Sequence, residues 1–564
     1  MTNIIEEIRE QIKNIVRNAL AAAAEKGELP MAEVDDIVIE APKEKEHGDF
    51  STNIAMQLAR QVRKAPGQTA AILIANMDFS SSYIDKAESA GPGFINFFLN
   101  KKWLNEALKR VVTEREDYGK ISIGHDQKVM VEFVSANPTG PLHMGNARGG
   151  ALGDCIASVL QAAGYDVTRE FYVNDAGNQI EKFGISLEAR FIQQLKGEDA
   201  IEFPEDGYQG IDIIDNVKSY IEEYGDKLLE AEPEVRRKTL VEYALPKNLQ
   251  RIKSGLSDYG INYDVWFLES SLYDSGELAD TLSYLREKGL TYEKDGAEWF
   301  KATEFGVDKD DVLVRNNGLT TYFASDIAYH RNKFLKRKFD RVINLWGADH
   351  HGHVARMKAA VEAVEVDPDK LDVVLFQLVR LFKDGQVARM SKRTGRAISL
   401  QDLLEDVGRD AVRFIFNTKA SGNHLDFDLD LAVKQSNENP VYYVQYAHAR
   451  ICSMIRLLES EGVTVPDKDN VDFDKLSAHE EIELMKKLAE FPDEIRISAQ
   501  TLEPSRLTRY VTDVASLFHS FYNACRVKGE EAELMKARLL LADAARIVIK
   551  NVLSILSISA PEKM

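Results

Sequence analysis

The stretch SANPTGPLHMGNARGG, from Ser135 to Gly150, decides the fold of the central part of the chain. It follows VMVEFVS, an apolar run typical of a buried strand, and it opens the helical pattern ALGDCIASVLQAA. A second strand pattern, TREFYV, comes next. Strand, glycine-rich turn, helix and strand in this order predict a βαβ unit. We therefore expect an open parallel sheet that binds ligands at the carboxyl ends of its strands.

The same stretch has the features of a phosphate-binding turn. Glycines such as Gly140 and Gly145 let the backbone approach a phosphate closely, and a helix N-terminus offers N–H donors and the positive end of its dipole. His143 adds a side-chain donor that can stabilise the charge developing at an α-phosphate. A tight turn with a capping histidine is the alternative, which HxG alone would favour. The whole string directly after a strand favours the phosphate site.

A basic loop is the second chemical feature. From Arg380 to Arg396, RLFKDGQVARMSKRTGR carries six basic residues against one acidic residue, although the whole chain has a net charge of −20. It overlaps the end of an apolar strand pattern, VVLFQLVRLF. A lysine in such a loop can close on the β- and γ-phosphates of ATP. A solvated surface loop is the alternative for the charge run alone. The loop contains the string Arg389, Met390, Ser391 and Lys392.

Composition excludes several classes of protein. The 564 residues have a mean hydropathy of −0.29, and no run approaches the ~18 apolar residues of a membrane helix. Isoleucines at helical spacing in the acidic N-terminal segment predict a folded helix instead of a signal peptide, hence a cytoplasmic protein. The isolated cysteines Cys155, Cys452 and Cys525 argue against disulfides and a zinc site. We expect no membrane, DNA, zinc or organic cofactor as a partner.

The chain divides into three regions by pattern. Residues 1–118 contain HGDFSTNIAMQLA and GPGFINFFL, which combine glycine turns with apolar runs and predict an α/β domain. Residues 119–438 predict a Rossmann-like parallel-sheet domain of the α/β class, with a charge-rich helical insertion at about 181–290. Residues 439–564 predict an all-α domain that ends with the apolar helix KARLLLADAARIVIKNVLSILSI.

The two signature strings resemble a known pair. HxGN at His143 and RMSK at Arg389 resemble the HIGH and KMSK signatures of class I aminoacyl-tRNA synthetases. Asn146 stands where the family usually has histidine, and Arg389 where it has lysine. The resemblance implies that His143, Gly145, Asn146, Arg389, Met390, Ser391 and Lys392 are catalytic. It also implies ATP contacts along the first motif, at Pro138, Thr139, Gly140, Pro141, Leu142, His143 and Met144.

Carboxylates and a phenol near these motifs have the chemistry to bind a guanidinium. Glu132 lies in an otherwise apolar strand, where an unpaired carboxylate is costly, and Asn137 follows five residues later. Tyr322 and Asp326, in TTYFASDIAYH, share one helical face. Such groups bind a guanidinium by charge-assisted hydrogen bonds. A helix cap or a structural ion pair is the alternative for Asp326 alone.

Together these segments resemble the arginine pocket of arginyl-tRNA synthetases, as do FYVNDAGNQ, from Phe171 to Gln179, and WGADHHGH, from Trp346 to His353. The resemblance places Gly347 and Asp349 at the adenosine ribose. His350 stands where many members have glutamine. The arginine-binding residues that the resemblance implies are Glu132, Ser135, Asn137, Tyr322, Asp326 and His350.

The resemblance extends over nearly the whole chain. HGDFS and GPGFINFFL are similar to the family's N-terminal tRNA-binding domain, and NPVYYVQYAHARI and the final helix to its anticodon-binding domain. There Tyr442, Tyr446 and Arg450 are placed to stack on or clamp anticodon bases, although core packing of the tyrosines is the alternative. The implied reaction converts arginine and ATP to arginyl-adenylate and transfers arginine to tRNA(Arg). Mg²⁺ would accompany ATP through its phosphates.

Three alternatives share part of this pattern. A cysteinyl-tRNA synthetase has a similar architecture but needs a zinc site, which the scattered cysteines do not provide. A small nucleotidylyltransferase also uses an HxGH turn but needs no long helical tail. A catalytically inactive synthetase-like RNA-binding protein is disfavoured because His143 and Lys392 are intact.

Overall fold

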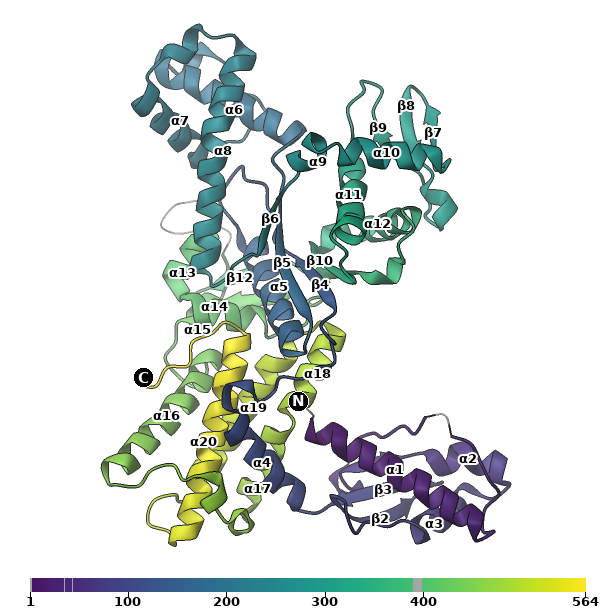
Figure 1. Cartoon of the computed structure of the whole chain (residues 1–564). Helices are drawn as coiled ribbons and strands as arrows, with labels where there is room; N and C mark the ends of the chain where they lie inside the picture. Colours follow the sequence, from purple (N-terminus) through teal and green to yellow (C-terminus); the bar gives the residue numbers. More distant parts are fainter. Residues whose placement is uncertain (1–2, 35, 43, 389–397) are drawn as a thin grey trace.

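The computed structural model describes residues 3–34, 36–42, 44–388 and 398–564. The RMSK string at Arg389–Lys392 therefore lies outside the described residues. The chain is elongated (Figure 1): an N-terminal α/β unit projects from one end, and two lobes stand at the other. The central sheet and the C-terminal helices lie between them.

The N-terminal unit packs three helices on a three-stranded antiparallel sheet of order β1-β3-β2. Its elements are α1 (Ile4–Glu25), β1 (Phe50–Thr52), α2 (Ile54–Val62), α3 (Pro66–Ala75), β2 (Ile84–Ala90) and β3 (Phe94–Leu99). The isoleucines predicted to share one helical face are buried along α1. They are Ile4, Ile5, Ile8, Ile12 and Ile15.

The predicted βαβ unit is present and forms the centre of a five-stranded parallel sheet of order β11-β10-β4-β5-β6. Its strands are β4 (Lys128–Glu132), β5 (Asp166–Val173), β6 (Val265–Leu268), β10 (Arg341–Gly347) and β11 (Leu371–Phe376), and α5 (Met144–Ala162) joins β4 to β5. The strand order reverses between β4 and β10. By the general rule for such sheets, ligands bind at the carboxyl ends of strands at this point. The expected α/β architecture is confirmed.

The helical insertion expected at about 181–290 is interrupted by a strand of the central sheet. Helices α6 (Asn178–Lys196), α7 (Ile211–Tyr224) and α8 (Pro233–Asp258) form one lobe with its own apolar core. The chain then returns to the sheet as β6, its edge strand. β6 has only four residues, flanked by Asp264 and Glu269, so the sequence lacks the longer apolar run that marked the other strands.

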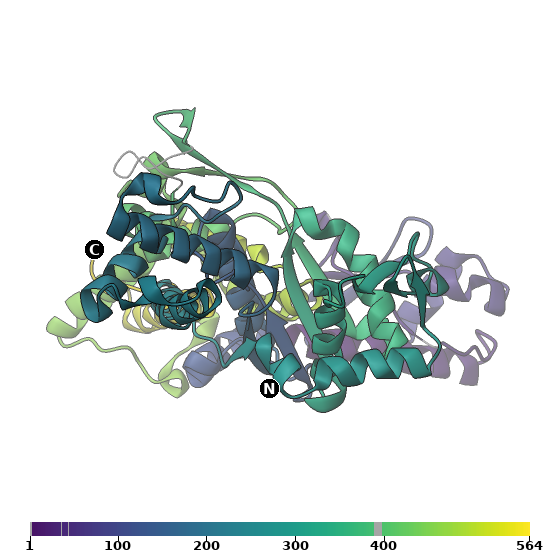
Figure 2. The same ribbon diagram turned by 90° about the horizontal axis from the view of Figure 1, so that it is seen from above.

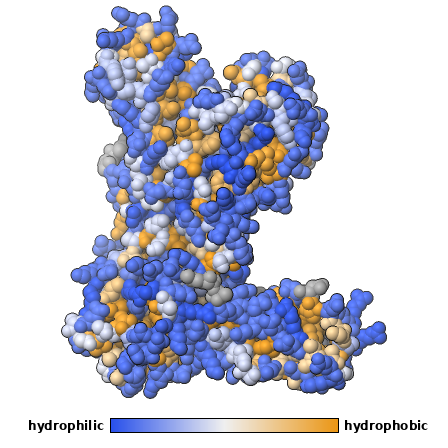
Figure 3. All heavy atoms as spheres, in the orientation of Figure 1, coloured by the Kyte–Doolittle hydropathy of each residue, from blue (hydrophilic) through white to orange (hydrophobic). Residues whose placement is uncertain are grey.

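The second lobe contains a small antiparallel sheet of order β7-β8-β9 and a separate apolar core. Its elements are α9 (Ser270–Asp274), α10 (Glu277–Glu287), β7 (Thr291–Lys294), β8 (Ala297–Phe300), β9 (Asp311–Val314), α11 (Tyr322–Arg331) and α12 (His351–Ala363). A π-helical turn, Asn332–Lys336, continues α11. Seen from above, α6–α8 and the second lobe lie on opposite sides of the central sheet (Figure 2). In the space-filling view a notch separates the two lobes (Figure 3).

The apolar run predicted as one strand from Val373 is divided between two sheets. β11 ends at Phe376, and β12 joins β13 and β14 in a separate sheet. At the break, the carbonyl of Gln377 accepts a hydrogen bond from the buried Arg148 of α5 (2.6 Å). The elements here are β12 (Val379–Lys383), β13 (Gln386–Val387), α13 (Leu400–Val407), α14 (Arg409–Phe416), β14 (Leu425–Asp428) and α15 (Leu429–Ala432).

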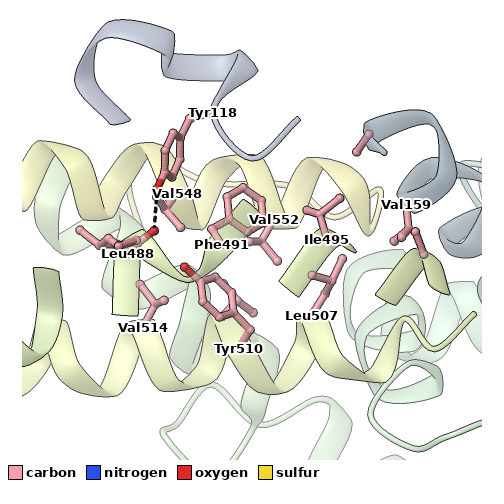
Figure 4. Packing of buried hydrophobic residues seen from close by; sticks show 14 of the residues in the cluster. Tyr118, Val159, Leu488, Phe491, Ile495, Leu507, Tyr510, Val514, Val548 and Val552 are labelled. Carbon is pink, nitrogen blue, oxygen red and sulfur yellow. Dashed lines mark hydrogen bonds between the residues drawn. The ribbon is translucent and has the colours of Figure 1, made fainter. Parts of the chain in front are cut away.

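The C-terminal region is helical, as predicted. It consists of α16 (Pro440–Ser460), α17 (His479–Ala489), α18 (Phe491–Thr501), α19 (Ser505–Ala524) and α20 (Ala532–Ile555). α4 (Lys102–Glu114) packs on α17 and α20, and Tyr118 after it donates to the carbonyl of Leu488 (3.0 Å; Figure 4). In the described part of the chain no helix is long and apolar enough to cross a membrane.

Candidate active site

The chain makes a strained turn as it leaves β4. Val134 (φ 70°) and Ser135 (φ 41°) both adopt positive φ, which costs about 1–3 kcal/mol for a β-branched residue. The Ser135 hydroxyl donates to Glu132 Oε1 (3.1 Å) and accepts from the backbone N–H of Tyr172 (3.1 Å). Because strain of this kind persists only where the surroundings enforce it, the turn marks the carboxyl end of β4 as a candidate site.

His143 is the N-cap of α5, and the helix fixes its ring. Its backbone N–H donates to the Asn146 side chain (3.0 Å), and the N–H of Gly145 donates to His143 Nδ1 (3.2 Å). Because Nδ1 accepts, the neutral ring carries its proton on Nε2. Partial burial lowers the pKa of His143, which favours this neutral form. A Cβ on residue 145 would lie 3.1 Å from the ring, so glycine fits here.

The capping alternative and the phosphate site are therefore both compatible with His143. Capping uses Nδ1 and leaves the Nε2–H without a hydrogen bond among the described residues. This donor stands at the N-terminus of a 19-residue helix, where the dipole and free backbone N–H groups favour an anion. Asn146, which departs from the usual signature, acts here as the third residue of a capping box.

The chain just beyond residue 397 pairs with this motif. The N–H of Leu400 donates to the carbonyl of Leu142 (2.8 Å), and His143 and Ser399 form an antiparallel bridge. The first motif is therefore held to the segment that follows residues 389–397. Pro138, Thr139 and Leu142 have buried side chains, whereas Gly140, Pro141 and Met144 are half-buried or exposed.

The carboxylate of Glu132 is paired inside the protein. Lys333, which is fully buried, donates to Glu132 Oε2 (2.5 Å) and to Asn344 Oδ1 (3.1 Å). Asn344 donates to His330 Nε2 (2.9 Å), and His330 Nδ1 donates to the carbonyl of Asp326 (2.8 Å). Burial lowers the pKa of His330, so its ring is neutral in this chain of bonds. The network links the end of β4 to the helix α11 that carries Asp326.

Further carboxylates surround the Tyr172 hydroxyl at the end of β5. Burial, then Glu269, Asp326 and Glu132, raise the pKa of Tyr172. Glu269, at the end of β6, is 1% exposed, and burial together with Asp326 and Asp175 raises its pKa to about 7. We call Glu132, Asp175, Glu269 and Asp326 the carboxylate cluster. Neighbouring like charges disfavour one another's ionisation, and the raised pKa of Glu269 reflects its burial and these acidic neighbours.

The predicted pair Tyr322 and Asp326 lies on α11, one turn apart. Asp326 Oδ2 contacts His353 Nε2 (3.2 Å), and its side chain is one-third exposed. Tyr322 is 40% exposed and lies against the turn at Gly177.

Asn137 is hydrogen-bonded to Gln179 of α6. Its amide donates to Gln179 Oε1 (2.6 Å), and the Tyr208 hydroxyl donates to the same oxygen (2.8 Å). Gly347, Asp349 and His350 lie at the carboxyl end of β10, with Asp349 and His350 mostly exposed and 3.6 Å apart. The structure thus brings Glu132, Ser135 and Asp326 into one network. Residue 350 stands apart from it, and His353 is the histidine that contacts Asp326.

Three family models match the chain in succession. Residues 10–99 match the arginyl tRNA synthetase N terminal domain, residues 107–437 the catalytic domain of class I (R) tRNA synthetases, and residues 444–564 the DALR anticodon binding domain. The second match alone covers more than half of the chain. The chain belongs to the arginyl-tRNA synthetase family.

Members of the arginyl-tRNA synthetase family are similar to the chain over its full length. The arginine–tRNA ligase of Acetivibrio thermocellus is 72% identical and that of Ruminiclostridium cellulolyticum 66% identical, each over 564 residues and 100% of both chains. The solved arginyl-tRNA synthetase of Thermus thermophilus has a TM-score of 0.73 at 22% identity, covering 97% of this chain and 99% of that one. The last comparison shows the shared fold.

In the region that matches the anticodon binding domain, the predicted residues Tyr442, Tyr446 and Arg450 are brought together on α16. The two tyrosine rings are parallel at 6.2 Å, Tyr446 stacks on His519 (5.9 Å), and Arg450 lies over the Tyr522 ring (4.0 Å). We call these five side chains the aromatic row. All are partly exposed. Both predicted alternatives, packing and base contact, are compatible with this geometry.

Sequence reasoning on this member of the arginyl-tRNA synthetase family missed Glu269, Lys333 and His353. Glu269 directly follows the apolar run VWFL, and an acidic residue after a short strand was an available signal. Lys333 contributes through a π-helical turn, which shifts the register of α11 and has no sequence signature. In the described parts of the chain, no group of three or more His, Cys, Asp or Glu residues could hold a metal ion.

Proposed function

We propose that this chain activates L-arginine with ATP to arginyl-adenylate and then esterifies arginine to the terminal ribose of tRNA(Arg), as an arginine–tRNA ligase. The observation that carries the proposal is the carboxylate cluster around Tyr172, at the carboxyl edge of the sheet and on the turn that leads into the phosphate motif. A cationic substrate bound there would have its reacting carboxylate close to the N-terminus of α5.

The guanidinium of arginine fits the charge of this cluster. The Glu132 carboxylate is already paired with Lys333, and one oxygen of Asp326 contacts His353. The negative charge that has no partner therefore lies on Glu269 and on the remaining lone pairs of Asp326. A guanidinium has five N–H donors in a planar fork and supplies one full charge. We assign its recognition to Asp326 with Tyr322 and Glu269. Glu132, Ser135, Asn137 and His350 complete the proposed arginine-binding set.

For ATP, we assign the segment Pro138, Thr139, Gly140, Pro141, Leu142, His143 and Met144. The His143 Nε2–H would donate to a non-bridging oxygen of the α-phosphate as the arginine carboxylate attacks and pyrophosphate leaves. Gly145 and Asn146 keep the imidazole in place. Gly347 and Asp349, at the end of the neighbouring strand, would receive the ribose, since an exposed carboxylate can accept its hydroxyls.

No protein nucleophile is needed, because positioning and charge stabilisation suffice for both steps. In the second step the ribose hydroxyl of tRNA attacks the arginyl carbonyl and AMP leaves. The string Arg389, Met390, Ser391 and Lys392, which lies outside the described residues, is proposed to bind the β- and γ-phosphates. Mg²⁺ belongs to the proposal as the companion of ATP, held mainly through phosphates and water.

For tRNA, we propose that residues 1–118 and 439–564 are the two tRNA-binding domains on either side of a catalytic domain at 119–438. The aromatic row supports this assignment at the C-terminal side, since partly exposed rings and an arginine offer stacking surfaces to splayed bases. Changing Tyr446 or Arg450 to alanine should weaken discrimination between tRNA transcripts with altered anticodons. Unchanged discrimination in both variants would place anticodon reading elsewhere.

The test of the proposed function is the charging of total tRNA with each of the twenty amino acids, supplied singly with ATP and Mg²⁺. We expect arginine alone to be esterified, with one AMP released per arginine. Pyrophosphate exchange should be measured with tRNA present. Charging of cysteine, or of no amino acid, would contradict the proposal.

A further inference from the structure

Arg413 of α14 is fully buried and joins three segments that are far apart in sequence. Its Nη2 donates to Asp154 Oδ2 (2.5 Å), its Nε to the carbonyl of Leu556 (2.8 Å), and its Nη1 to the carbonyl of Tyr259 (3.2 Å). Asp154 belongs to α5, Leu556 caps the end of α20, and Tyr259 caps the end of α8. We call Asp154, Arg413 and Leu556 the Arg413 node.

The node has no vacant bonding site for a ligand. Asp154 is 3% exposed and also accepts from Arg169 Nε (3.0 Å) and from the Ser557 hydroxyl (3.2 Å). Two guanidinium groups and one hydroxyl thus surround one carboxylate. An interaction that is buried, saturated and shared between segments fixes their relative positions. The node is therefore a structural connection.

From the node, the chain after α20 runs to the helix that carries the aromatic row. Ser559 donates to the carboxylate of Asp410 through both its N–H (3.2 Å) and its hydroxyl. Gln445 of α16 donates to Asp410 Oδ2 (2.9 Å) and to the carbonyl of Ser559 (2.9 Å). His448, also on α16, bonds to the carbonyl of Pro561 (2.9 Å). Hydrogen bonds therefore tie α16 to Ser559 and Pro561, which follow Leu556 closely in the chain.

In the other direction, the node leads to His143. Asp154 lies on α5 about three turns beyond His143, roughly 16 Å along the helix axis. α5 is almost wholly buried and packs on α18, and its Val159 lies with Ile495 and Leu507 in the C-terminal core (Figure 4). α14 follows α13, whose N-cap residue forms the bridge to His143. Arg413 thus holds both elements that position the imidazole.

We propose that Arg413 is a positioning residue that couples contact of the anticodon with the C-terminal helices to the placement of His143. This proposal rests on the proposed function. Anticodon contacts that favour one position of α16 would, through Ser559, Leu556 and Arg413, favour the position of α5 in which the imidazole N–H meets the α-phosphate. Interfaces that are tightly packed transmit such shifts because they have few alternative arrangements.

The test compares Arg413→Lys with the control Arg169→Lys. Lysine at 413 keeps a positive charge for Asp154 but cannot also reach Leu556 and Tyr259, whereas Arg169 contacts Asp154 without contacting the C-terminal tail. Arginylation would be measured with a native tRNA(Arg) transcript and with one whose anticodon is changed. For the wild type we expect the changed anticodon to raise KM and to lower kcat by on the order of tenfold.

In Arg413→Lys, kcat with the native transcript should fall to the value obtained with the changed one, so that the ratio of the two kcat values approaches one. The ratio of KM values should persist, because the base contacts are intact. Arg169→Lys should keep both ratios. A general loss of stability would lower both kcat values together and leave their ratio unchanged.

A second variant avoids the buried pair altogether. Asp410→Ala removes the acceptor shared by Gln445 and Ser559 and should reduce the kcat ratio in the same direction, by a smaller factor. If Arg413→Lys does not fold, the kcat ratio of Asp410→Ala tests the proposed coupling instead. A kcat ratio that stays at the wild-type value in these variants, or no kcat difference in the wild type, would overturn the coupling alone. A wild type that charges no arginine would overturn the proposed function and the coupling with it.

Discussion

The carboxylate cluster and the Arg413 node both contain buried charged side chains, but their charges balance differently. In the node, the Asp154 carboxylate forms a one-to-one pair with the fully buried Arg413, and the less buried Arg169 also contacts it. In the cluster, Glu269 lies among other carboxylates, and burial and these neighbours raise its pKa to about 7. A buried charge excess costs free energy unless a partner supplies the opposite charge. The balanced group is therefore structural, and the unbalanced one is suited to a cationic substrate.

The largest effect should come from breaking the balanced group. Asp154→Asn leaves the Arg413 guanidinium buried without its counter-charge and should lower the free energy of unfolding by about 3–5 kcal/mol. The KM for arginine should change little, because Asp154 is three helical turns from His143. Urea unfolding followed by circular dichroism measures the first quantity, and arginine titrations the second. A raised arginine KM at unchanged stability would contradict the structural assignment.

His143 stands between the two regions, at the end of α5 nearest the cluster. His143→Ala should lower kcat by about 10²–10³-fold with little change in the KM for arginine, because the Nε2–H acts mainly in the transition state. His143→Ser is the matched control, since serine restores the N-cap without the imidazole donor. Full recovery of kcat in His143→Ser would show that capping, and not phosphate contact, is the role of this residue.

Asp326→Asn tests the unbalanced group. The substitution keeps the shape of the side chain and removes one charge, so the KM for arginine should rise about hundredfold while that for ATP stays near its original value. The KM for citrulline, a neutral isostere of arginine, should rise less in this variant than the KM for arginine does. Asp372→Asn, which breaks the surface pair with Arg341, is the control. An unaltered arginine KM in Asp326→Asn would place the guanidinium elsewhere.

The smallest expected effect is a pH dependence of the KM for arginine, which tests the charge of the carboxylate cluster. Because the pKa of Glu269 is raised to about 7, its carboxylate is largely protonated at lower pH and gains charge as the pH rises. Arginine remains cationic, so its KM should fall by up to about tenfold between roughly pH 6 and pH 8. His353 contacts Asp326 Oδ2 (3.2 Å). Glu269→Gln leaves His353 in place, and should abolish the slope; a slope that persists would assign it to another group.

The sequence predicted the parts of this site that depend on local pattern. The turn after β4, the N-terminus of α5 and the one-turn spacing of Tyr322 and Asp326 follow from glycine spacing and helical periodicity, which act over a few residues. The identity of the family followed from the same strings.

The parts that were missed depend on tertiary contacts. Glu269 enters the site because the edge strand β6 returns to the sheet between two helical segments, and Lys333 because a π-helical turn rotates it toward Glu132. The split of one apolar run into β11 and β12 is a third case. A break of two residues moves the chain from one sheet to another without interrupting the apolar pattern of the sequence. Periodicity cannot report pairings between residues more than 100 positions apart.

The bonds from Arg413 to the end of α20 have a consequence for the order in which the enzyme is made. A ribosome delivers β4, α5 and the carboxylate cluster long before it delivers Leu556, and domains generally begin to fold as they emerge. Until that last helix arrives, α5 lacks the carbonyl and the core residues that hold its far end. A nascent chain can therefore form its central sheet before the far end of α5 is anchored, and synthesis of the final turn of α20 supplies that anchor.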